Sequence, residues 1–142
     1  MKFSQAEAQL KAAILPILRQ LDNEISKIRP EIRPRVLEGD GGDLSQYRNY
    51  NFTLDCQVSD TYKDKAVEDK HEIVLVIELK QRHPDVPPRL NAFVMDTIND
   101  EESIVKNEAF QENMPASQDT IKALVDRLPD LYRTFKNTLA EL

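Results

Sequence analysis

Nucleophilic and metal chemistry depends above all on cysteine and histidine, and this chain of 142 residues has one cysteine and two histidines. Cys56 could act as a nucleophile only beside an imidazole base, which His71 or His83 would have to supply. However, Cys56 lies in an alternating stretch, in phase with Phe52 and Leu54, and this pattern favours a buried and unreactive thiol. The sequence therefore predicts no catalytic residue.

The sequence also predicts no metal ion and no cofactor. A zinc site needs three or four ligands, and the two histidines and one cysteine have no metal-binding spacing. Residues 39–43 read Gly-Asp-Gly-Gly-Asp and contain all three glycines of the chain. They lack the alternating acidic ligands of a calcium loop and the lysine and serine of a phosphate loop. We interpret this segment as a turn.

Composition excludes further classes of partner. The net charge is −6 and the pI is near 5.0, whereas nucleic-acid binding needs a basic face. No apolar run approaches the ~18 residues of a membrane span, and the chain starts without a signal region. We therefore expect a cytoplasmic protein that binds neither membrane nor nucleic acid. One basic cluster stands out, which either receives an anionic partner or forms a solvated rim: Lys27, Arg29, Arg33 and Arg35.

An amphipathic helix is predicted from about residue 5 to residue 28, because apolar residues recur there at intervals of three and four. Ser4 and Glu7 match a capping box at its start. Pro16 lacks a backbone donor, so we expect a kink or a restart of the helix there. The expected apolar face consists of Leu10, Ile14, Ile17, Leu18, Leu21, Ile25 and Ile28.

A second amphipathic helix is predicted at the end of the chain. Ser117 is its expected N-cap, and Asp119 lies in the first turn, where the helix dipole favours an acidic residue. Pro129 interrupts this helix as Pro16 interrupts the first, so a bend is expected here too. The expected apolar face consists of Ile121, Leu124, Val125, Leu128, Tyr132, Phe135 and Leu139.

About four strands are predicted between the two helices. A short edge strand begins at Val36, after a segment whose prolines cannot continue a helix. Residues 50–59 alternate between apolar and polar, as in a strand with one buried face. Residues 73–79 are apolar on both faces, which is typical of a central strand, and residues 90–95 form the next strand.

The remaining segments are expected to connect these elements. Residues 60–70 are polar and charged, which indicates a long exposed connection. Between residues 96 and 115 the pattern is ambiguous, and Ile104, Val105 and Phe110 belong either to a short helix or to a packed loop. The resulting fold class is α+β, an antiparallel meander between two helices. We expect residues 1–142 to form a single domain.

Residues 71–94 are the most distinctive segment of the chain: an apolar strand, a turn and a second strand. The turn spans residues 82–88 and reads Arg-His-Pro-Asp-Val-Pro-Pro. Its prolines fix backbone angles and so keep it rigid. This segment resembles the signature turn of the ubiquitin-conjugating enzymes and their RWD relatives, in which an aromatic–proline pair and a following proline lock the turn.

The predicted order of helix, meander, proline turn and final helix also resembles that superfamily. His83 stands where the family usually has tyrosine. Its active members carry a catalytic cysteine after the turn, near a His-Pro-Asn motif. Here no cysteine or histidine follows Pro88, and Cys56 precedes the turn. The resemblance therefore implies a non-catalytic, RWD-like interaction domain.

The predicted function is accordingly protein binding without catalysis. The proline turn is the first candidate surface, and the exposed face of the last helix is the second. An acidic secretion chaperone or immunity-type binding protein is an alternative, because such proteins share the small size, the negative charge and the long terminal helix. An enzyme without a recognisable motif and a homodimer also stay open. The predicted partner contacts are Arg82, His83, Pro84, Pro87, Pro88 and Arg89.

Overall fold

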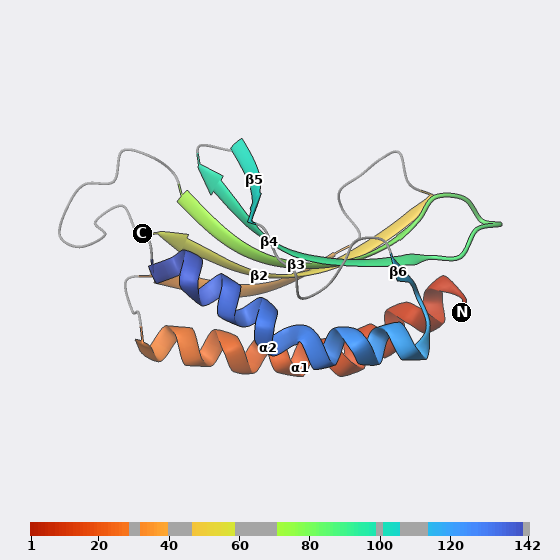
Figure 1. The fold of residues 1–142 in the computed structure, drawn as a ribbon, viewed down its shortest axis with the longest axis horizontal. Coiled ribbons are helices and arrows are strands. Elements are labelled where there is room, and N and C mark those ends of the chain that lie inside the picture. Colours follow the sequence, from red (N-terminus) through yellow and green to blue (C-terminus); the bar gives the residue numbers. More distant parts are fainter. Residues whose placement is uncertain (29–31, 40–46, 59–70, 99–100, 106–113, 141–142) are drawn as a thin grey trace.

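The computed structural model describes residues 1–28, 32–39, 47–58, 71–98, 101–105 and 114–140. The fold is α+β, as predicted, and both helices lie on the same face of one antiparallel sheet (Figure 1). In chain order the elements are α1 (Phe3–Ile28), β1 (Ile32–Gly39), β2 (Arg48–Val58), β3 (His71–Gln81), β4 (Arg89–Ile98), β5 (Glu101–Val105), β6 (Met114–Pro115) and α2 (Gln118–Ala140).

The sheet is a meander in which each strand pairs with the next one along the chain. Its order is β1-β2-β3-β4-β5, and the short β6 pairs with β4. Over the described residues the meander thus has five strands, where about four were predicted. β3 is central, as predicted, and residues 73–77 are each no more than 7% exposed. Both faces of β3 are therefore excluded from water at its centre.

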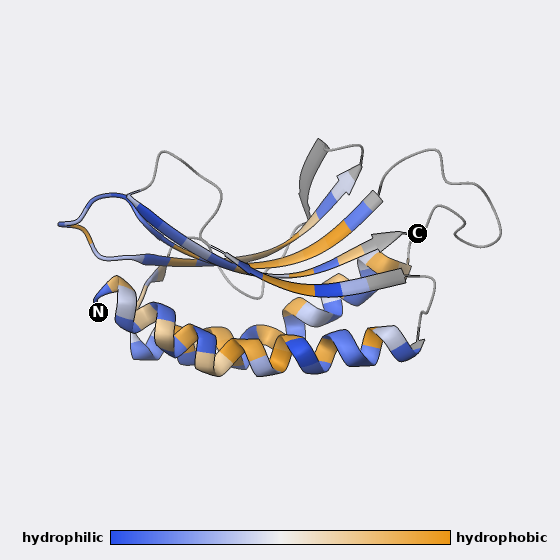
Figure 2. Cartoon of the chain, turned by 180° about the vertical axis from the view of Figure 1, so that it is seen from behind, coloured by the Kyte–Doolittle hydropathy of each residue, from blue (hydrophilic) through white to orange (hydrophobic). Residues whose placement is uncertain are grey.

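The core lies between the sheet and the two helices. Figure 2 shows hydrophobic residues, in orange, where the helices face the sheet. Phe52, Leu54 and Cys56 of β2 are buried as predicted. The sequence pattern missed Leu131, which is fully buried, whereas Ile17, Leu21, Val125 and Tyr132 of the predicted apolar faces are only partly buried.

The two helices begin in different ways. Ser117 caps α2 as predicted: its N–H donates to Thr120 Oγ1 (2.8 Å), and the Thr120 N–H donates to Ser117 Oγ (3.1 Å). The predicted capping box of Ser4 and Glu7 is wrong, because α1 begins at Phe3 and Ser4 lies inside its first turn. The N–H of Lys2 instead donates to Gln5 Oε1 (3.2 Å). Burial of Phe3 explains the earlier start, since its ring is 4% exposed.

Both internal prolines lie inside continuous helices. α1 continues through Pro16, so the predicted restart does not occur, and α2 likewise continues through Pro129. Both prolines are exposed, so the backbone carbonyl that loses its partner can bond to water. Figure 1 shows that α2 changes direction about half-way along its length, as a proline near its middle predicts.

Strand β1 is longer than predicted. It begins at Ile32 instead of Val36 and includes Pro34, which lies opposite Cys56. A proline is tolerated in an edge strand, because the side of the backbone that lacks a donor can face away from the neighbouring strand. The prolines of this segment thus exclude a helix but do not exclude an edge strand.

Residues 101–105 also form a strand that was not predicted. Ile104 and Val105 lie in β5, which pairs with β4, so the short helix is wrong at these positions. Phe110 and the predicted connection at residues 60–70 are outside the described residues, as is most of the predicted turn at residues 39–43. The strand escaped prediction because five residues with three polar ones show little periodicity.

Candidate interaction site at the proline turn

The proline turn closes the hairpin of β3 and β4 at the end of the sheet near the N-terminus (Figure 1). The N–H of Val86 donates to the carbonyl oxygen of His83 (3.2 Å), which makes residues 83–86 a β-turn. Pro84 occupies the second position, where its fixed φ suits the turn. The side-chain Nε2 of Gln81 donates to the carbonyl oxygen of Val86 (3.0 Å) and ties the turn to the end of β3.

The base of the turn is attached to the segment before α2. Pro88 is buried, and its carbonyl oxygen accepts a hydrogen bond from the N–H of Ala116 (2.8 Å). Arg89 and Leu90 pair with β6. Bonds at both ends therefore hold the turn in one position. The turn then loses less conformational entropy when a partner binds to it.

The six predicted contact residues differ in exposure. Arg82, His83, Pro84 and Arg89 are exposed, as is Pro87, whereas Pro88 is buried and supports the turn from beneath. The prediction left out Val86, whose side chain is 39% exposed at the tip of the turn.

A hollow of about 410 Å³ lies between the turn and the start of α1. Residues 84–88 and Gln81 form one side, and Met1, Lys2 and Gln5 form the other. The sequence pattern predicted the turn but not this neighbour. Nothing in the local sequence of either segment indicates that the first residues of the chain meet a turn about eighty residues later.

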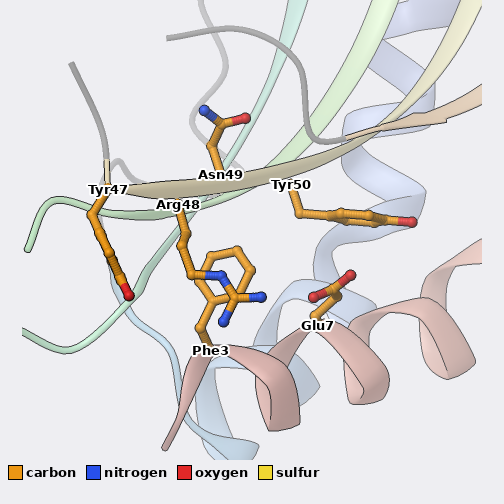
Figure 3. A pocket seen from close by; sticks show the side chains of 6 residues that line it. All are labelled: Phe3, Glu7, Tyr47, Arg48, Asn49 and Tyr50. Carbon is orange, nitrogen blue, oxygen red and sulfur yellow. The ribbon is translucent and has the colours of Figure 1, made fainter. Parts of the chain in front are cut away.

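A second hollow, of about 260 Å³, lies on the other side of the start of α1 (Figure 3). Its lining residues are Phe3, Glu7, Tyr47, Arg48, Asn49 and Tyr50. The guanidinium carbon of Arg48 is 4.4 Å from the centre of the Phe3 ring, a cation–π contact. Figure 3 shows Asn49 pointing to the opposite side of β2 from Arg48 and Tyr50.

The thiol of Cys56 is fully buried, as the strand pattern predicted. Burial, with smaller contributions from Asp55 and Asp22, raises its pKa to about 12. Cys56 pairs with Ile73 near the start of β3, whereas His83 lies beyond the end of β3. At the rise of a strand, roughly 25 Å separates Ile73 from His83. The side chain of His71 is outside the described residues.

We expect Cys56 to resist alkylation by iodoacetamide in the folded protein, because the thiolate is the reactive form. Between the ordinary pKa of 9.0 and about 12, the unfolded chain loses the thiol proton and the folded chain keeps it. The free energy of unfolding should therefore fall as pH rises through this interval. Urea titrations at several alkaline pH values measure this slope, and Cys56→Ala should reduce it. Equal labelling rates in native buffer and in urea would contradict the burial.

Other candidate sites have weaker support. Within the described ranges, no three His, Cys, Asp or Glu side chains are grouped so that they could hold a metal ion. In the predicted basic cluster, Arg35 binds the carboxylate of Asp55 through its Nη2 (3.0 Å) and Nε (3.2 Å). Arg29 and the side chain of Arg33 are outside the described residues.

Comparison of the chain with protein-family models, with curated proteins and with solved structures found no match. Among the described helices, none is long and apolar enough to cross a membrane.

Proposed function

We propose that this chain is a cytoplasmic, non-catalytic domain that binds a protein partner through the proline turn. The observation that carries the proposal is a turn that is exposed at its tip and fixed at its base. Gln81 holds its interior, and the bond between Ala116 and Pro88 holds its end. A rigid loop binds with a smaller entropic cost than a mobile one, so such a turn suits recognition better than a free loop would.

The resemblance to the RWD relatives supports the same function. It implies a helix, a meander, a proline turn after the third strand and a final helix, and the fold has this order. It also implies a non-catalytic member, since no cysteine or histidine follows Pro88. The high pKa of the Cys56 thiol agrees with a structural role for that residue.

Co-purification from native lysate tests this proposal. The tagged chain is compared with an Arg82→Glu/Pro87→Ala variant, which changes two exposed positions on the turn. The matched control is Lys122→Glu/Ala123→Ser, at two exposed positions on α2, the other predicted surface. We expect the turn variant to lose a specific protein that the wild type and the control retain. A partner lost only with the α2 variant would refute the turn as the binding surface.

A further inference from the structure

The two hollows lie at one end of the molecule, on opposite sides of the start of α1. Both are lined by residues from the start of α1. Gln81 lines one hollow and Arg48 lines the other, and these two residues are direct partners in the ladder between β2 and β3. We call residues 1–7, 47–50 and 81–89 together the turn end. An extended segment of a partner could follow the turn end from one hollow to the other.

The turn end is basic, although the whole chain carries a charge of −6. Arg89 shares the opposite face of the sheet with Lys80 and Asn49, so the other charged side chains of the turn end are three basic and two acidic, a local charge of +1. The first turn of α1 has no acidic residue, so no side-chain charge offsets the positive end of the helix dipole there. These basic side chains are Lys2, Arg48 and Arg82, and the acidic ones are Glu7 and Asp85.

Arg48 has the most defined geometry of these basic side chains. One face of its guanidinium rests on the Phe3 ring, which is itself 4% exposed and therefore fixed. In the part of the chain that the structure describes, no carboxylate lies within ion-pair distance of Arg48. The stacking leaves the N–H edges of the guanidinium available, and these edges bind a carboxylate in a bidentate manner.

We infer that the turn end binds an extended acidic segment of a protein, with one carboxylate of that segment on the guanidinium of Arg48. This inference rests on the proposed function and specifies the chemistry of the partner. Tyr47 and Tyr50 flank the site (Figure 3) and offer rings against which the apolar part of the segment packs. Glu7 lines the same hollow and opposes a second negative charge.

Fluorescence anisotropy with a labelled hexaglutamate peptide tests the inference, with hexalysine as the comparison peptide. We expect hexaglutamate to bind and hexalysine not to bind. Arg48→Met keeps an apolar chain over Phe3, and it should weaken hexaglutamate binding by about tenfold. Arg48→Lys keeps the charge but loses the planar fork, so its effect should be smaller. Glu7→Gln should strengthen binding because it removes a repelling carboxylate.

Arg127→Met is the matched control, because Arg127 is exposed on α2 and lies outside the turn end. Thermal unfolding establishes that each variant is folded. Unchanged affinity in both Arg48 variants, or equal loss in Arg48→Met and Arg127→Met, would overturn the inference. The inference would also be overturned if a lysate partner were lost with Arg82→Glu/Pro87→Ala but retained by Arg48→Met. That result would leave the proposed function in place. Arg48-dependent peptide binding, with a lysate partner indifferent to the turn, would refute only the proposed function.

Discussion

Replacing Phe135 by alanine should destabilise the protein by about 3–5 kcal/mol. The Phe135 side chain is completely buried on the face of α2 that packs against the sheet. Its ring stacks on Tyr132 with 6.5 Å between the ring centres. Substitution removes the transfer free energy of the ring and leaves a cavity that the surrounding side chains fill only in part. Because domains have about 5–15 kcal/mol of stability in total, this loss would leave little margin.

Urea unfolding followed by circular dichroism measures this effect. Asn137→Ala is the control on the same helix, because Asn137 is exposed, and its effect should stay within about 0.5 kcal/mol. A loss below about 1 kcal/mol for Phe135→Ala would mean that α2 is not part of the core. A chain that ends at Ala116 should not unfold cooperatively, since it lacks every buried side chain of α2.

The helices and the longer strands could be predicted because their buried residues repeat with the period of the element. Leu131 was missed because the buried face of α2 is turned from the predicted stripe towards Leu131 and Thr138. The start of α1 was missed for another reason. Ser4 has the side chain of an N-cap, but burial of Phe3 extends the helix past it. A tertiary contact thus outweighed a local preference.

Only the part of the candidate site that one continuous segment forms could be predicted from the sequence. The turn at residues 82–88 is marked by its own prolines, whereas the two hollows depend on contacts between α1, β2 and the turn. Such contacts join segments that are distant in the sequence and have no common pattern. Arg48 was not predicted as a site residue, because its role depends on the Phe3 ring beneath it.

The pair of Arg35 and Asp55 shows the same limit. The alternation of apolar and polar residues over 50–59 predicts that Asp55 lies on the exposed face of its strand. In the structure it is only 5% exposed and lies opposite Arg35 of β1 and Val74 of β3. Both Arg35 bonds reach Oδ2, and Oδ1 has no hydrogen-bond partner among the described residues. The carboxylate therefore depends on one guanidinium that is itself half exposed.

Arg35→Met should consequently destabilise the protein by about 2–3 kcal/mol. This loss is smaller than the loss on breaking a fully buried ion pair, because solvent reaches Arg35. The substitution leaves a buried carboxylate without its cation, whereas Asp55→Val leaves an exposed cation that water can solvate. The double variant Arg35→Met/Asp55→Val should recover most of the loss, because Val74 beside it is already apolar. Urea titrations of the four proteins give the coupling energy of the cycle. A double variant as unstable as Arg35→Met would show that the side chains act by packing and not by charge.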